Sequence, residues 1–233
     1  HNGILSPKYL TEELFNNRNL TPTYDLPSHL DRLASYLPDH YDTLILINQH
    51  TLLPIYQPFQ PDTVMHYAVQ VLRGEQYQSL HTKLGKNASR IKAVSSFRFC
   101  PHCWQEQMQQ YGEVYWKCSW QITGYEYCTR HQQSLSVSSM SCNGIDRKFY
   151  FAHLNALKDS SQLVFNLQDV NHHNELAGLI EELLAHSTSI SVQDFSTLSD
   201  TYFLLLKDRD LLLNRKNIKN EKVRQLVVDY WGE

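Results

Sequence analysis

Two short motifs of cysteine and histidine constrain this chain more than any other feature of its sequence. The first is Cys100-Pro-His-Cys103 and the second is Cys128-Thr-Arg-His131, with 24 residues between Cys103 and Cys128. A tetrahedral zinc ion needs four sulfur or nitrogen donors, and two such pairs from separate segments supply them without strain. A disulfide or a redox-active Cys-x-x-Cys pair would leave the matched position of His131 unexplained. The spacing therefore predicts one zinc ion bound by Cys100, Cys103, Cys128 and His131.

The donor set also predicts what kind of metal site this is. All four ligands come from the protein, so no coordination position is left for water or a substrate, and we expect a structural zinc ion. A zinc hydrolase would need a metal-bound water and a nearby carboxylate base. The sequence contains no His-Glu-x-x-His motif and no glycine-rich phosphate loop. We therefore predict that the protein is not an enzyme.

The composition is that of an ordinary globular protein. The chain has 233 residues, 42% of them hydrophobic, which is enough for one large domain or two small ones. We expect no membrane span and no secretory signal. Five cysteines, three of them at metal spacing, favour a reducing cytoplasm, and we expect Cys118 and Cys142 to be small buried or partly exposed thiols. Because His1 is not an initiator methionine, we expect a fragment of a longer protein.

The charged residues are unevenly distributed, although the formal net charge is only −3. Basic clusters lie in 76–105 and 211–224, and an acidic stretch without Lys or Arg lies between them in 159–206. Such clusters are often solvated faces without a partner. They are also a weak indication of separate surfaces for DNA and for protein. The candidate contacts to DNA phosphates are Lys83, Lys86, Arg90, Lys92, Arg215, Lys216, Lys219, Lys222 and Arg224.

Short helices are predicted for the N-terminal part of the chain. Proline positions and apolar spacing place them at about 7–16, 27–37, 43–48 and 62–73, with Asp42 as an N-cap and Gly74 at the last end. Prolines at positions 54, 58 and 61 predict an extended crossing before the fourth helix. A helix-turn-helix module shows this pattern, and so does any small helical bundle, so both interpretations stay open.

The middle of the chain is predicted to fold around the metal. A short strand at 97–99 leads into the first motif, and a helix at 104–111 ends at Gly112. Many aromatic residues stand between the motifs. We interpret them mainly as the core packed around the zinc site, with stacking on nucleic-acid bases as the alternative. We expect His102 to point away from the metal.

The C-terminal part is predicted to be helical. The clearest helix is 171–186, and a helix or strand–helix junction is expected at 147–157. Adjacent residues of a helix point about 100° apart, so we expect His172 and His173 to be solvent-exposed and not a ligand pair. Helices at 197–208 and 220–230, joined by a basic connector, form a second candidate helix-turn-helix. The expected core-facing residues are Leu176, Leu179, Ile180, Leu183 and Leu184 in the first helix, and Val223, Leu226, Val227 and Tyr230 in the last.

Together these patterns predict a mainly α protein. Helix-turn-helix-like modules are expected to flank a small zinc element with three Cys ligands, one His ligand and short strands. The predicted divisions are an N-terminal helical module at 1–75, a zinc-binding module at 76–145 and a C-terminal helical module at 146–233.

The motifs resemble those of the TniQ/TnsD family of transposon target-site selection proteins. The resemblance is carried by Phe97-Arg-Phe-Cys-Pro-His-Cys103, Tyr111-Gly-Glu-Val-Tyr-Trp116 and Tyr127-Cys-Thr-Arg-His131, which occur in the family's order. Thr129 departs from the family pattern, which usually has proline there. Upstream, Leu26-Pro-Ser-His-Leu30, the segment 50–59 and Ser89-Arg-Ile-Lys92 are similar to TnsD, and the resemblance is strongest from about Pro27 to Leu135.

The resemblance implies a DNA-binding adaptor without chemistry of its own. A TnsD-like protein recognises one double-stranded attachment site, in the best-known branch at the end of the glucosamine-phosphate synthase gene. It then recruits the AAA+ ATPase TnsC, which brings in the transposase. In other branches a TniQ-like adaptor is carried by an RNA-guided CRISPR complex and reads little DNA itself. The upstream motifs make this chain more similar to TnsD, and the CRISPR-linked adaptor is the alternative.

Overall fold

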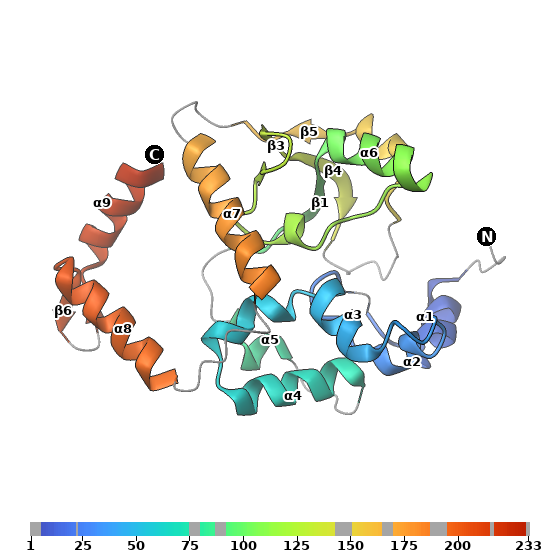
Figure 1. Ribbon diagram of the computed structural model, residues 1–233, viewed down its shortest axis with the longest axis horizontal. Coiled ribbons are helices and arrows are strands. Elements are labelled where there is room, and N and C mark those ends of the chain that lie inside the picture. Colours follow the sequence, from blue (N-terminus) through green and yellow to red (C-terminus); the bar gives the residue numbers. More distant parts are fainter. Residues whose placement is uncertain are drawn as a thin grey trace.

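The computed structural model confirms a mainly α protein with a few short strands (Figure 1). The structure describes residues 6–21, 23–74, 80–86, 92–142, 151–164, 170–186, 195–214 and 217–231. Three parts are used below: the N-terminal helices (residues 6–86), the metal-motif region (residues 92–142) and the C-terminal arm (residues 195–231). No helix among the described residues is both long and apolar enough to cross a membrane.

The N-terminal helices begin and end where local signals place them. They are α1 (Pro7–Phe15), α2 (Leu30–Ala34), α3 (Thr43–His50), α4 (Asp62–Arg73) and α5 (Leu80–Lys83). The Asp42 carboxylate caps α3 by accepting a hydrogen bond from the Ile45 backbone N–H at 2.7 Å. Gly74 ends α4 with a φ of 106°, a left-handed conformation that favours glycine. Helices α2 to α5 share a leucine-rich cluster that includes Leu30, Ile47 and Leu72.

The prediction of an extended segment at prolines 54 and 58 is wrong. Leu53–Phe59 forms a 3-10 helix, η1, with Pro54 in its first turn and Pro58 inside it. Proline fixes φ near −65°, which a 3-10 turn accepts as readily as an extended chain does. Leu53, Pro54 and Pro58 are all buried. Burial of this apolar segment against the neighbouring helices therefore selects the compact conformation.

A small antiparallel sheet organises the metal-motif region. Strand β4 (Ser136–Ser141) pairs with β1 (Ser96–Phe99) on one side and with β5 (Ser161–Gln162) on the other. A second, two-stranded ladder joins β2 (Tyr127–Cys128) to β3 (Gln133–Ser134). Helix α6 (Pro101–Tyr111) starts inside the first motif, three residues earlier than predicted, because proline is well suited to a first helical position. It ends at Gly112 as predicted.

The interpretation of the aromatic residues as core is confirmed for most of them, but Tyr111 and Tyr115 are exposed. Phe99, Trp104, Trp120 and Tyr125 are buried in one cluster with Cys100, Cys103 and Cys128. The rings of Phe99 and Trp104 are stacked with their centroids 4.0 Å apart. The 3-10 helix η3 (Ser119–Gln121) carries Trp120 into this cluster. The metal motifs are therefore continuous with the main hydrophobic core.

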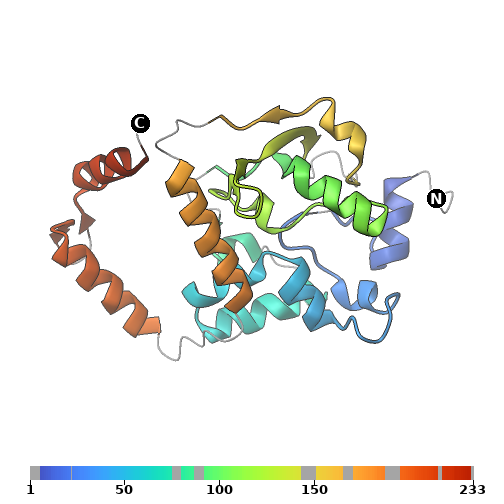
Figure 2. The ribbon, with the colours of Figure 1, turned by 45° about the horizontal axis from the view of Figure 1, so that its top comes forward.

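Helix α7 (Val170–His186) lies across the metal-motif region and next to η1 (Figures 1 and 2). Ile180 of the predicted stripe and Ala177 are buried, but Leu179 is 56% exposed, so the predicted stripe is wrong at that position. The expected solvent exposure of the histidine pair is wrong for His173, whose side chain is only 13% exposed and lies 3.7 Å from Glu126. The physical reason is that α7 packs through its small residues and its first turn, which brings His173 against Glu126.

The C-terminal arm differs most from the prediction. Helices α8 (Phe195–Asp208) and α9 (Asn220–Trp231) are present, but the hairpin of β6 (Leu212–Asn214) and β7 (Asn217–Ile218) replaces the tight turn of a helix-turn-helix. Leu226 and Val227, expected to face a core, are 47% and 50% exposed. In both views the arm lies apart from the main body (Figures 1 and 2). In the predicted 147–157 segment, 151–157 is described and holds the 3-10 helix η4 (Leu154–Leu157), while 147–150 lies outside the described residues.

The buried carboxylate of Asp25 forms ion pairs with His81 and Lys86, which follow α4 in the sequence. These contacts make the stability of the fold depend on pH. Asp25 has a 4% exposed side chain that binds His81 Nε2 at 2.9 Å and the Lys86 ammonium. Burial by itself would raise the pKa of Asp25, but hydrogen bonds from His81 and Lys86 hold that pKa well below its ordinary value.

Because the folded pKa of Asp25 is depressed, its contribution to stability is present above the ordinary aspartate pKa and is lost as the pH falls below it. We expect the free energy of unfolding to fall between pH 5 and pH 3 by roughly 1 kcal/mol more in the native chain than in Asp25→Asn. Urea unfolding of both proteins across this range measures the difference. If the free energy of unfolding depended on pH in the same way in both proteins, Asp25 would not be the group responsible.

Candidate metal centre

The four predicted donor atoms, two from each motif, lie close together. The ligand atoms of Cys100, Cys103, Cys128 and His131 all lie within 4.8 Å of one another. The Nδ1 atom of His131 lies 3.6 Å from the Cys100 sulfur, 3.3 Å from that of Cys103 and 3.7 Å from that of Cys128. The sulfurs of Cys103 and Cys128 are 3.7 Å apart. The predicted ligand set is therefore one cluster in space.

These separations can be compared with the edges of a zinc tetrahedron. Zn–S bonds of about 2.3 Å and Zn–N bonds of about 2.0 Å give tetrahedral edges of roughly 3.8 Å between sulfurs and roughly 3.5 Å between sulfur and nitrogen. Four of the six distances between donor atoms, 3.3–3.7 Å, fall close to these edges, and all six are within 4.8 Å. Three thiols and one imidazole are also donors that zinc prefers. The residues present therefore fit a four-coordinate zinc ion.

Short local structures hold the donors in place. Cys100 follows β1 and is the N-cap residue of α6, while Cys103 lies in the first turn of that helix. Cys128 ends β2, and the Cys128 carbonyl accepts a hydrogen bond from the Gln132 backbone N–H at 2.8 Å. This tight turn brings His131 back over Cys128. The start of α6 therefore positions Cys100 and Cys103, and the turn between β2 and β3 positions Cys128 and His131.

Two polar side chains that the sequence did not reveal, Glu106 and Gln133, contact the donor residues, and a third, Arg130, binds Glu106. Glu106 lies 3.3 Å from His131 Nε2, the ring nitrogen opposite the donor atom. A carboxylate at that position orients a metal-binding histidine and favours the Nδ1 atom as the ligand. Arg130 donates to the same Glu106 oxygen at 3.0 Å, and Gln133 donates to the Cys100 sulfur at 3.0 Å. The spacing of Cys103 and Glu106, three residues on one helix, was the signal that could have identified Glu106.

The crowded thiols cannot all ionise without a cation. Hydrogen bonds from Cys103 and Cys128 hold the pKa of the Cys100 thiol below its ordinary value. Hydrogen bonding with Cys100 raises the pKa of Cys103, since a second thiolate beside the first is unfavourable. A divalent metal ion removes this conflict, because it stabilises several adjacent thiolates at once. His102 is exposed and outside the donor cluster, and its ring stacks on that of His131 with the centroids 5.5 Å apart.

The turn of the second motif is bound to α7. Glu181 of α7 accepts hydrogen bonds from the Tyr125 hydroxyl and, at 2.8 Å, from the Thr129 hydroxyl. Thr129 is the residue that stands where the family pattern usually has proline, which could not donate this bond. The metal motif therefore also positions the helix that follows it.

The candidate DNA contacts occupy different environments. Lys86 binds Asp25, and the Lys83 ammonium lies 4.4 Å from the centre of the Tyr67 ring. Lys92 is exposed. Arg90, Arg215 and Lys216 lie outside the described residues.

In the C-terminal arm, two of the candidate lysines share a carboxylate. Lys219 donates to Asp210 at 2.6 Å, and Lys222 binds the other oxygen of the same carboxylate. Their hydrogen bonds lower the pKa of Asp210 to about 2. Arg224 is exposed on α9. Among the described residues, Lys83, Lys92 and Arg224 are the exposed candidates that form no ion pair, and Lys83 differs from the other two because its ammonium lies over the Tyr67 ring.

Comparison with known proteins gives the same assignment as the motifs. A family model described as TniQ matches residues 1–135, which include both halves of the donor cluster. The chain is 37% identical over 133 residues to the transposon Tn7 transposition protein TnsD of Escherichia coli. This alignment covers 56% of the chain and 26% of the relative, so the match spans about a quarter of the relative's length. Because the family model matches more than half of its residues, the chain belongs to the TniQ family.

Proposed function

We propose that this chain selects the target site of a multi-protein DNA transposon and recruits the transposon's AAA+ regulator, TnsC, to that site. The observation that carries the proposal is the similarity to the Tn7 transposition protein TnsD, together with the TniQ match. In this function the protein binds a double-stranded attachment site and acts on the transposase only through TnsC. It catalyses no reaction and works in the bacterial cytoplasm beside the nucleoid.

We propose further that the donor cluster binds one structural zinc ion. Four protein donors at tetrahedral separations leave no position for water, which favours a stabilising role over a catalytic one. We keep the modules 1–75, 76–145 and 146–233 as the proposed units. The packing of α7 on the metal-motif region supports a role for the zinc ion in joining the second unit to the third.

The proposed DNA contacts are the basic side chains of the two clusters, with Lys92 and Arg224 as the most accessible. Each phosphate contact releases counterions, so affinity should fall steeply with salt. In electrophoretic shift assays we expect tighter binding to attachment-site DNA than to a scrambled duplex.

Reversal of both charges, Lys92→Glu with Arg224→Glu, should reduce the slope of log affinity against log salt by about 2. Lys8→Glu, at an exposed position on α1, is the matched control. Equal, salt-independent binding of both duplexes would rule out direct recognition by this chain.

A second candidate function is that of a protein adaptor, for example one linking an RNA-guided CRISPR complex to the transposition machinery. The observation that favours it is the apolar surface of the C-terminal arm, where the exposed side chains include Tyr202, Leu204, Leu213 and Leu226. Pull-down of TnsC in the absence of DNA separates the two functions. Retention of TnsC without any specific DNA shift would favour the adaptor.

A further inference from the structure

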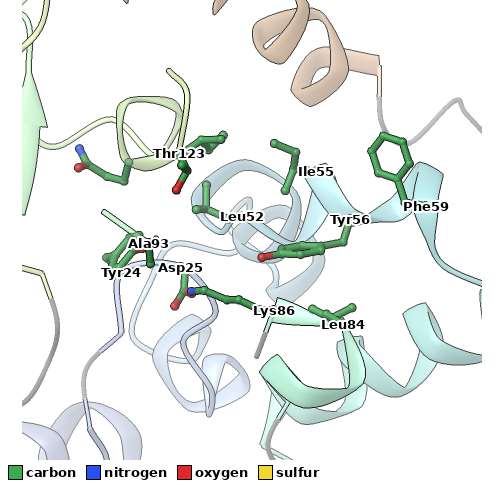
Figure 3. Close-up of a pocket in the computed structure, with 13 residues that line it drawn as sticks. Tyr24, Asp25, Leu52, Ile55, Tyr56, Phe59, Leu84, Lys86, Ala93 and Thr123 are labelled. Atoms are coloured by element: carbon green, nitrogen blue, oxygen red, sulfur yellow. The ribbon is translucent and has the colours of Figure 1, made fainter. Parts of the chain in front are cut away.

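A groove of about 560 Å³ separates the N-terminal helices from the metal-motif region (Figure 3). One wall comes from the segment around Tyr24, from η1 and from the end of α5, and the opposite wall comes from Ala93 and from residues 121–123. Its size falls in the range of cavities that bind ligands. The groove shares no residue with the donor cluster, so zinc binding does not account for it, and Lys86 is the one proposed DNA contact among its lining residues.

The walls of the groove suit a large apolar side chain. Leu52, Ile55, Leu84 and Ile122 supply aliphatic surface from both sides. Phe59 lies at the edge of the groove with 52% of its surface exposed, so part of its ring is accessible to a partner. Aromatic residues at the rim of an apolar depression are typical anchors of protein interfaces.

The polar groups of the groove favour an acidic partner. Asp25 is the acidic residue among those lining it, and its carboxylate is already bound by His81 and Lys86. The ammonium of Lys86 has three donors and reaches into the groove beside Tyr56 (Figure 3). Lys92 is exposed next to the lining residue Ala93, and its carbonyl accepts from Thr123 at 3.3 Å. No acidic residue occurs from 76 to 105, so the lysines at this edge face no local carboxylate except Asp25.

We propose that this groove binds an acidic segment of a partner protein, with one large apolar side chain seated between Ile55, Tyr56 and Phe59 and its carboxylates toward Lys86 and Lys92. Double-stranded DNA would satisfy the lysines but offers no separate apolar group for the cavity unless a base leaves the stack. A protein segment supplies both features together. The proposal goes beyond target-site selection and does not depend on which DNA the chain binds.

The test uses the whole chain and a panel of fluorescein-labelled nonapeptides. Each peptide has a central phenylalanine or alanine, flanked by glutamate or by lysine, and binding is measured by anisotropy. We expect saturable binding of the phenylalanine peptide with glutamate flanks. Replacing its central residue by alanine should weaken binding at least fivefold, and so should Phe59→Ala in the protein, since both remove the anchor contact. Lys92→Glu should weaken the same peptide.

Tyr9→Ala, at a 54% exposed position on α1, is the matched control and should leave peptide binding unchanged. Circular dichroism and metal content establish that Phe59→Ala folds, which its exposure favours. The proposal is overturned if no peptide of the panel binds saturably, if the alanine or lysine peptides bind as well as the phenylalanine–glutamate peptide, or if Phe59→Ala binds unchanged. It is equally overturned in favour of a nucleic-acid site if duplex DNA displaces the peptide and Phe59→Ala weakens DNA binding to the same extent.

Discussion

Cys128→Ser should yield a chain that does not fold stably. Cys128 is buried and contributes one of the four donors, and serine is a poor zinc ligand. Binding of a structural zinc ion adds on the order of 10 kcal/mol to folding, which matches the entire stability of a typical domain. We expect Cys128→Ser to aggregate or to lose its cooperative unfolding transition. Metal analysis should find about one zinc per native chain and well below that in the variant.

The control for this experiment is Cys118→Ser. Cys118 is partly buried near the same core but lies outside the donor cluster. It should keep its zinc and its unfolding midpoint should change little. Treating the native chain with a chelator tests the same prediction without mutation and should unfold it. A soluble, cooperatively folded Cys128→Ser that still binds DNA would contradict the structural role of the metal.

Trp104→Ala should produce the second largest loss of stability. Trp104 is fully buried one residue after Cys103, its ring lies 4.9 Å from that of Trp116, and its Nε1 donates to the Tyr115 carbonyl at 3.1 Å. Removing a buried tryptophan leaves a cavity and costs about 3–5 kcal/mol. The unpaired carbonyl adds to this loss. Urea unfolding of the zinc-loaded proteins, compared at a common m value, measures the change.

Tyr111→Ala provides the comparison on the same helix. Tyr111 is 56% exposed at the end of α6, so its loss should change stability by about 0.5 kcal/mol or less. If Trp104→Ala shifted the midpoint no more than Tyr111→Ala does, the aromatic cluster would not be the core around the metal motifs. Full zinc content in Trp104→Ala would show that its lost stability comes from packing.

The donor cluster could be predicted because its information is local. Each pair of ligands lies within four consecutive residues, and the chemistry of zinc restricts which residues can share a site. The helix ends were predictable for the same reason, as the cap at Asp42 and the left-handed Gly74 show. The contact of Glu181 with Thr129 was not predictable, since 52 positions separate the two residues.

The wrong predictions concern positions where the local sequence pattern is compatible with two structures. Proline fixes one backbone angle, so the segment at 53–59 is compatible with an extended chain and with the 3-10 helix that burial selects. The spacing of apolar residues predicts that a helix has an apolar face, but not whether anything covers that face. The exposed side chains of Leu179 and Leu226 show this limit.

Thr129 gives this protein a property that a proline at the same position would not. Its hydroxyl connects the loop between Cys128 and His131 directly to the middle of α7. The orientation of a 17-residue helix is thereby linked to the shape of a turn that carries two of the four candidate metal ligands. If an ion binds there, its loss should disturb the seating of α7 as well as the donor cluster, so an effect at the metal would reach a helix that contributes no ligand.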